Sequence, residues 1–321
     1  MSRGNTLIDT ATEEAAEQKT PRRPGDRIFS GLSMFAGITI LVALAGVFIF
    51  LMIEGIPGLT QPAAQYAPRA TNFLGYVWPL LFGTILAAVI AVIIAAPLSF
   101  GIALVISHYA RKSVATPAAY VIDLLAAVPS VVFGLWGINV LAPKLVDPYN
   151  WLFTHLGWIP LFDGPPSATG KTILTAGVVL AIMILPIITA ISREIFAQTP
   201  RLHQEAALAL GATRWEMIRL TVFPYARSGM VSATMLGLGR ALGETMAVAM
   251  VLSAGGGVSF NLISSSNPAS IASNIASNYK EGTPAKVTIL IATGLVLFLV
   301  TFVVNFAARW LVGRSERKMN R

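Results

Sequence analysis

Six long apolar segments, separated by polar or irregular stretches, set the pattern of this chain. They cover about 29–53, 77–106, 118–142, 172–192, 228–252 and 285–312. Each reaches the roughly 20 residues that a helix needs to cross about 30 Å of hydrocarbon. Because a backbone in lipid must satisfy its hydrogen bonds internally, we expect all six to be helices. The pattern predicts an all-α integral membrane protein with six transmembrane helices.

The composition supports a membrane protein and argues against an enzyme. Hydrophobic residues make up 55% of the 321 positions and charged residues 12%, whereas soluble domains carry about 25% charged residues. There is no cysteine, so neither a disulfide framework nor a thiolate metal site is possible. The histidines, His108, His155 and His203, are scattered without metal-ligand spacing. We therefore expect no metal, no cofactor and no catalytic group.

Lysine and arginine are distributed unevenly between the polar stretches. With six spans, most of them fall on one side: in the N-terminal tail, in the second-to-third and fourth-to-fifth connections, and in the C-terminal tail. The other side holds only Arg69, Lys144, Lys171, Lys280 and Lys286. Since positively charged loops stay in the cytoplasm, both termini are predicted to be cytoplasmic. This topology explains the net charge of +8 without any binding of nucleic acid.

The connection between the fourth and fifth apolar segments has strong helix signals. Pro200 suits a first helical position because its missing N–H would be unpaired there, and Gly211 can end that helix in the left-handed conformation. Thr213 and Glu216 form a T-x-x-E capping box, which opens a second helix. That helix is predicted to close before Pro224. The pattern predicts two short cytoplasmic helices.

Two charged residues interrupt the fifth apolar segment. Arg240 and Glu244 lie four residues apart and so share one face of a helix. If the span begins near Ser228, Arg240 lies roughly 18 Å into the membrane. A charge there costs at least about 2.5–3.5 kcal/mol, so such residues face a bundle interior or a wet cavity and mark ion or substrate paths. The alternative is an ion pair within or between helices that neutralises itself.

Three further polar features have structural and functional interpretations. Ser130 could donate a hydrogen bond to an anion, but a bond to its own helix is the commoner arrangement. Asp123 is expected to pair with Arg111, Lys112 or a partner chain rather than to meet a substrate. Residues 270–279 are expected to form a short surface helix on the outer side.

A nucleotide-binding motif is absent from the sequence. Residues 164–172 look like a phosphate-binding loop, but their spacing is one residue too long and two prolines remove backbone donors. They also fall on the outer side, away from cytoplasmic ATP. Any ATP-driven process would therefore need a separate ATPase chain.

Several motifs resemble a known family of transport proteins. Glu205, Ala206 and Ala207, followed by Gly211, are similar to the EAA loop of ABC importer permeases. The run GLGRALGETMAV at 237–248 resembles the fifth-span signature of phosphate-specific permeases of the PstC type. Segments 126–134 and 97–103 also resemble that family, and the resemblance covers roughly residues 28–313.

The resemblance implies a type I ABC importer permease fold in the bacterial inner membrane. It also implies that Arg240 and Glu244, with Ser130 as a weaker candidate, lie on the phosphate pathway. The EAA loop would then couple the chain to ATPase subunits. The implied partners are a PstA-type second permease, PstB-type ATPases and a PstS-type external phosphate-binding protein.

On this basis the chain divides into four parts. They are a disordered cytoplasmic tail (1–27), a first transmembrane helix with its outer loop (28–76), an ABC importer transmembrane domain (77–313) and a cytoplasmic tail (314–321). The alternatives are the sibling permease, a permease for molybdate or sulfate, a purely structural assembly subunit, and a secondary transporter or channel that works without ATP. Inverted repeats or helices broken at mid-membrane would favour the secondary transporter, and neither is evident in the sequence.

Overall fold

The computed structural model describes residues 24–68, 70–253, 255 and 257–319, and it is helical with no strand in these residues. The chain divides into two units, one up to Phe50 and one from Leu51 onward. In the first unit the described residues belong to a single helix, α2 (Pro24–Gly55). The predicted disordered tail lies outside the described residues up to position 23, and its last four residues are the start of α2.

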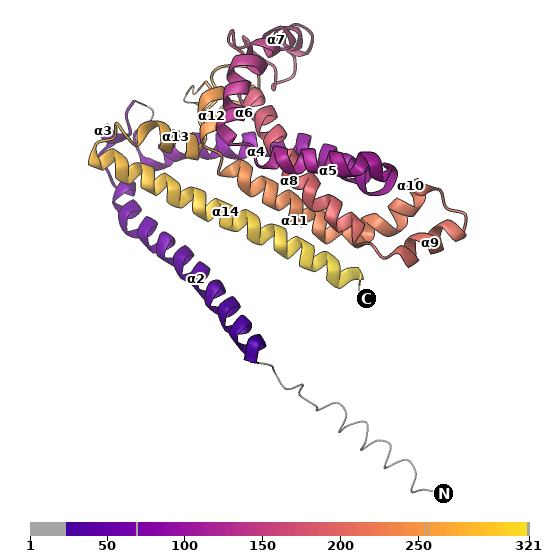
Figure 1. Ribbon diagram of the computed structural model, residues 1–321. Helices are drawn as coiled ribbons and strands as arrows, with labels where there is room; N and C mark the ends of the chain where they lie inside the picture. The colour runs from indigo at the N-terminus through magenta and orange to yellow at the C-terminus, as the bar shows by residue number, and fades with distance from the viewer. Residues whose placement is uncertain (1–23, 69, 254, 256, 320–321) are drawn as a thin grey trace, which may run out of the picture. The chain divides into compact units, whose positions relative to one another are not determined.

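The second unit contains the remaining helices (Figure 1). The longer ones are α4 (Phe73–Leu104), α5 (Lys112–Ala126), α6 (Ser130–Trp136), α7 (Ala142–Leu156), α8 (Ile173–Ala197), α11 (Phe223–Leu242) and α14 (Pro284–Met319). The short ones are α3 (Ala63–Tyr66), α9 (Arg201–Ala209), α10 (Arg214–Met217), α12 (Met246–Val251) and α13 (Ile271–Asn278). Four further turns join them: a 3₁₀ turn, η1 (Ile56–Leu59), and three π-helical turns, η2 (Val105–Tyr109), η3 (Gly137–Leu141) and η4 (Ile218–Val222).

Five helical stretches in the described chain are long and apolar enough to cross a membrane, so the predicted count of six spans is not confirmed. They are Ile28–Leu59, Phe73–Tyr109, Ser130–Leu156, Ile173–Ala197 and Pro284–Trp310. The fifth predicted span is not among them, and its residues are divided between α11 and α12. The last predicted span does form, but α14 continues to Met319 and includes most of the predicted tail at 314–321.

The third predicted span, 118–142, is also not one continuous helix. It begins inside α5, passes a non-helical break at 127–129, continues through α6 and η3, and ends at the first residue of α7. Pro129 explains the break, because it has no N–H to donate and disfavours helical geometry at Val128. The third and fifth predicted spans are therefore each divided between two helices.

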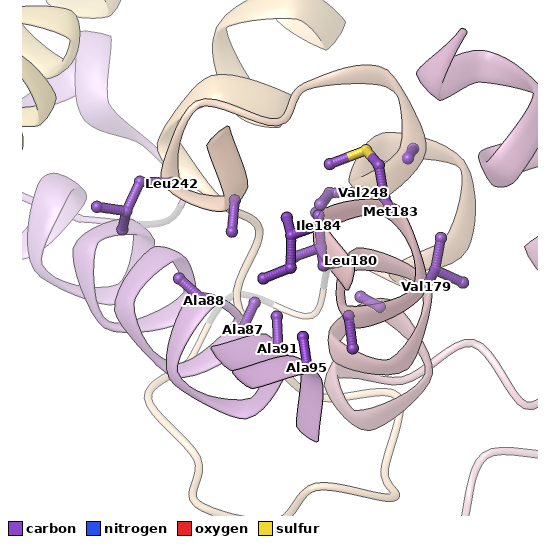
Figure 2. Packing of buried hydrophobic residues seen from close by; sticks show 14 of the residues in the cluster. Ala87, Ala88, Ala91, Ala95, Val179, Leu180, Met183, Ile184, Leu242 and Val248 are labelled. Atoms are coloured by element: carbon purple, nitrogen blue, oxygen red, sulfur yellow. The ribbon is translucent and has the colours of Figure 1, made fainter. Parts of the chain in front are cut away.

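The core of the second unit forms where α4 packs closely against α8. Figure 2 shows the small side chains of α4 facing the larger side chains of α8. Ala88, Ala91 and Ala95 are fully buried, as are Leu180 and Ile184 opposite them. Since alanine lets two helix backbones approach, this face holds the two helices together without a large side chain from α4. Residues of α11 and α12 complete the same cluster.

The short helix predicted at 270–279 is confirmed as α13, but it is not a surface helix. Ser270 and Ser273 form its capping box. The N–H of Ile271 donates to the hydroxyl of Thr84 (2.9 Å), and the amide of Asn274 donates to the hydroxyl of Tyr76 (3.0 Å). Residues 271–274 are buried. These bonds fix α13 on α4 at the end of the unit opposite α9 and α10 (Figure 1).

Candidate functional site

The break between α11 and α12 surrounds Glu244. The helix α11 ends at Leu242, and α12 begins at Met246. Only 8% of Glu244 is exposed, and its Oε1 accepts a hydrogen bond from the N–H of Ala247 at 3.1 Å. A carboxylate in this position satisfies a backbone donor that the first turn of a helix leaves unpaired. Glu244 therefore caps α12.

Arg240 lies in the last turn of α11 and is exposed. The alternative of an ion pair between Arg240 and Glu244 is not seen, since the only ion pair within the described residues joins Arg193 to Asp123 at 3.6 Å. The guanidinium of Arg240 is therefore available to an outside group. Its planar fork can bind two oxygens of an oxyanion and never loses its charge.

Ser130 is brought to the same region by the packing of α6 against α12. Gly134 contacts Ala247, and Gly137, three residues further on, contacts Val251. The contact that is further along α6 is also further along α12, so the two helices run parallel. Ser130 therefore lies at the same end of this helix pair as Glu244. Ser130 is half-buried and makes no side-chain hydrogen bond in the described part of the chain. The alternative of a bond to its own helix is thus not realised.

Asp123 is paired, as expected, but not with either of the two residues predicted from this chain. This residue of α5 pairs with Arg193 of α8, not with Arg111 or Lys112. Arg111 and Lys112 lie at the start of α5, far from Asp123 near its end, whereas α5 packs along α8. The pair is partly exposed, so it contributes at most about 1 kcal/mol to stability.

The first helix of the fourth-to-fifth connection ends as predicted. Pro200 precedes α9 as its N-cap rather than as its first helical residue. At the other end Gly211 has φ +88°. Its N–H donates to the carbonyl of Leu208 (3.0 Å), and the N–H of Ala212 donates to that of Ala207 (3.2 Å). This pair of bonds is a Schellman motif, which needs a left-handed residue at this position.

The capping box of the second helix is also confirmed, but its predicted end is not. The hydroxyl of Thr213 accepts from the N–H of Glu216, whose carboxylate accepts from the N–H of Thr213 at 2.7 Å. The hydrogen bond from the backbone N–H of Thr213 is the main cause that lowers the pKa of the Glu216 carboxyl. The helix does not close before Pro224. It continues through η4 into α11, because the wider π-turn makes room for the proline ring.

The surface of α9 is suited to a partner. Glu205 and Ala206 are exposed, and Ala207 is half-buried against the cluster that joins α4, α8 and η4. Two leucines are strongly exposed, Leu202 at 75% and Leu210 at 90%. Exposed leucines next to a polar loop are typical of a protein-binding surface.

Two glycines were not singled out as contacts in the sequence analysis. Gly134 and Gly137 both lie on the face of α6 and η3 that meets α12. Their spacing of three residues within an apolar segment is a signal for close helix packing. The pairing of α6 with α12 could not have been read from that signal, because the spacing of two glycines does not say which helix packs against them.

Together, the long apolar helices define a multi-pass membrane protein, with candidate polar residues at two helix breaks. Residues 97–320 match the family described as "Binding-protein-dependent transport system inner membrane component". The protein "Phosphate transport system permease protein PstC 2" of Mycobacterium tuberculosis is 46% identical over 304 residues, 91% of this chain and 93% of the relative. A PstC protein of Xylella fastidiosa is 40% identical over 324 residues, 98% of each chain. The chain belongs to this family of inner membrane transport components.

Solved structures of ABC transporters share the fold. A chain of the MetNI methionine ABC transporter, described as inward facing, has a TM-score of 0.50 at 16% identity, covering 74% of this chain and 93% of its own. A chain of a bacterial ABC transporter involved in alginate import has a TM-score of 0.57 at 15% identity, covering 90% and 99%. At these identities the likeness concerns the fold alone.

Proposed function

We propose that this chain is the permease subunit of an ATP-driven importer of inorganic phosphate and forms half of its translocation pathway. The observation that carries the proposal is the similarity to proteins named as PstC permeases, which extends over nearly their whole length. The geometry at the α11–α12 break adds support, because it offers an unpaired guanidinium to an oxyanion. The chain itself would hydrolyse no ATP.

In the proposed pathway, Arg240 is the residue that binds phosphate. Its guanidinium is exposed and has no ion-pair partner in the described chain. Ser130 would supply a hydroxyl donor from the neighbouring helix. Glu244 would hold the start of α12 in place through its bond to Ala247, and as a buried carboxylate it would meet the substrate less directly. A phosphate would therefore pass between one cation and one neutral donor.

The connection that contains α9 is proposed to dock the ATPase subunits. Glu205 and Ala206 lie on its exposed surface, and the exposed leucines offer apolar contacts. Ala207 and Gly211 would hold α9 in the shape that docks. ATP binding would move this connection and shift the pathway between inward and outward access. Such a switch needs each ligand to favour one of the two states.

The proposed assembly has the partners that the family implies. A PstA-type permease would complete the pathway, two PstB-type ATPases would bind in the cytoplasm, and a PstS-type protein would deliver phosphate from outside. Both termini would then be cytoplasmic. The C-terminal end of α14 lies at the end of the second unit that carries α9 and α10 (Figure 1), which supports this orientation for the C-terminus.

One observation favours a second candidate, a transporter that works without ATP. The helices break at α5–α6 and at α11–α12, and broken helices near mid-membrane are common in secondary transporters. The relatives named as PstC permeases weigh against it. The other open alternatives, a sibling permease or a permease for molybdate or sulfate, leave the ATP-driven class unchanged. ATP dependence and anion competition separate these candidates.

The test is uptake of labelled phosphate by the four-component complex in proteoliposomes. We expect wild-type uptake to require ATP and to resist competition by sulfate. Arg240→Gln should assemble but lose more than about tenfold in uptake, because a hydrogen bond to a charged group contributes about 1.5–3 kcal/mol. Lys280→Gln, which removes an exposed positive charge at 280 outside the proposed pathway, is the matched control.

Three outcomes would contradict parts of the proposal. Normal uptake by Arg240→Gln would remove Arg240 from the pathway. Equal transport of sulfate would make phosphate the wrong substrate while leaving an importer in place. Uptake by wild type without ATP would favour the secondary transporter.

A further inference from the structure

We infer that Gly134 and Gly137 are positioning residues for transport, because they hold α6 against α12 and so fix Ser130 beside Glu244. This inference rests on the proposed function, since the two glycines lie outside the group of residues expected to meet phosphate. They act through the helices that carry those residues.

At Gly134 the limiting contact is with backbone. A Cβ added there would lie 2.9 Å from the Cα of Ala247 and 3.0 Å from the Sδ of Met250. The sulfur sits on a flexible side chain and can move away. The Cα cannot, so any larger residue at 134 must push α12 away from α6. Glycine at this position is therefore required by space and not by backbone conformation.

At Gly137 the limiting contacts are with side chains on two sides. A Cβ added there would lie 2.8 Å from a methyl group of Val179 on α8 and 2.8 Å from a methyl group of Val251 on α12. Gly137 thus sits between two helices and sets the distance of η3 from both. Protein interiors are packed too densely to absorb an added methyl group at such a point without a shift.

The contact lies close to the polar residues that it would position. Ser130 is one helical turn before Gly134, and Glu244 is three residues before Ala247. At about 1.5 Å per helical residue, Ser130 lies roughly 6 Å along α6 from this contact, and the carboxylate of Glu244 accepts the N–H of Ala247 itself at 3.1 Å. A displacement at Gly134 is therefore transmitted to the distance between Ser130 and Glu244 with little loss.

The short length of α12 makes this contact more important. Six residues form too few internal hydrogen bonds to fix the direction of a helix by themselves. The direction of α12 is set instead by the Glu244 cap at its start and by neighbouring helices along its length. When α6 is pushed away, the cap remains but one of these supporting faces is lost. Ser130 and Glu244 would then still be present, but their positions relative to one another would change.

The experiment compares the kinetics of phosphate uptake by Gly134→Ala, Gly137→Ala and wild type in the reconstituted four-component complex. We expect each variant to assemble normally and to show an apparent KM for phosphate raised several-fold. We also expect weaker discrimination between phosphate and sulfate. A role in folding alone would reduce the amount of assembled complex and the maximal rate without changing KM or discrimination. Gly101→Ala is the matched control, because no atom lies within 4 Å of a Cβ at that helical position.

Compensating variants separate the two glycines. Replacing Val179 and Val251 with alanine removes both blocking methyl groups, so it should return the KM of Gly137→Ala toward the wild-type value. The double valine variant on the wild-type background controls for the volume it removes. Met250→Ala should not restore Gly134→Ala, because the backbone contact with Ala247 remains.

The outcomes distinguish this inference from the proposed function. If wild type takes up phosphate and both glycine variants keep its KM and discrimination, the positioning role is wrong while the proposed function stands. If wild type takes up no phosphate, the proposed function is wrong and this inference falls with it. Rescue of Gly134→Ala by Met250→Ala would show that side-chain crowding, and not helix separation, is the cause.

Discussion

Gly211 ends α9 with a left-handed backbone, and no atom lies within 4 Å of the place where its Cβ would be. Space is therefore not the constraint at this residue. The constraint is the φ of +88°, which costs a β-branched residue more than it costs any other type. The Schellman bonds at the end of α9 depend on that conformation.

We predict that Gly211→Val abolishes uptake while the chain still inserts and assembles. The valine would force the chain out of the left-handed region and change the direction in which α9 presents Glu205. Uptake per assembled complex is the measurement. Gly211→Asn is the control, since asparagine tolerates the left-handed region and should keep most of the uptake. Normal uptake by the valine variant would contradict a docking role for the shape of this loop.

Single residues were predictable where the signal is local. Gly211 and the pair Thr213–Glu216 act within four residues of themselves, so the sequence alone indicates their roles. The partner of Asp123 was not predictable, because Arg193 is 70 positions away and the packing of α5 on α8 decides the pair. That Arg240 has no ion pair with Glu244 was also not predictable from the spacing. Glu244 is close enough in sequence to pair with Arg240, but its carboxylate accepts the N–H of Ala247 at the start of α12 instead.

At the scale of elements, the start of α10 should depend on pH. The backbone hydrogen bond from Thr213 lowers the pKa of Glu216 in the folded chain. A lowered pKa means that the ionised carboxylate stabilises the fold above its ordinary pKa. That stabilisation is lost as the pH falls through the lowered folded value.

We therefore predict that the Thr213 amide loses protection from hydrogen exchange as the solution becomes acidic. Exchange of the 211–217 segment, measured by mass spectrometry over a series of pH values, is the readout. In Glu216→Gln the side chain still accepts the bond but does not titrate, so protection corrected for the intrinsic exchange rate should be independent of pH. The same pH dependence in both chains would show that another group is responsible.

The elements themselves were predictable as long as a helix is uninterrupted. Four of the six apolar segments correspond to stretches that can cross a membrane, because length and hydrophobicity decide that property. Average hydrophobicity does not report the two breaks, although Pro129 marks the first of them in the sequence. Gly243, Glu244 and Thr245 lie among apolar residues, and the helix stops there because a carboxylate offers the next helix a cap.

At the scale of the whole molecule, the open question is whether α11 and α12 together cross the membrane. Ser113 lies at the start of α5, before most of α5–α7, α8 and α11–α12, and Ser277 follows them in α13. If these three parts each cross once, the two serines lie on opposite sides. We predict this arrangement, with Ser113 in the cytoplasm, because the basic residues cluster on its side.

Single-cysteine variants can test this topology, since the chain has no cysteine of its own. Both serines are exposed, so Ser113→Cys and Ser277→Cys form a matched pair. In intact cells a membrane-impermeant maleimide should label Ser277→Cys alone, and after permeabilisation it should label both. Labelling of both variants in intact cells would mean that α11 and α12 do not complete a crossing.

The π-turn η4 also has a consequence for changes in chain length. From Arg214 to Leu242 the chain is helical without a gap, a rod of about 40 Å at 1.5 Å per residue. A π-turn holds one residue more than an α-turn of the same extent. Removing one residue from Ile218–Val222 would use up this surplus and leave the rotational phase of Arg240 unchanged. Removing one residue between Phe223 and Arg240 would instead turn Arg240 about 100° around the helix axis and so change the direction in which its guanidinium points.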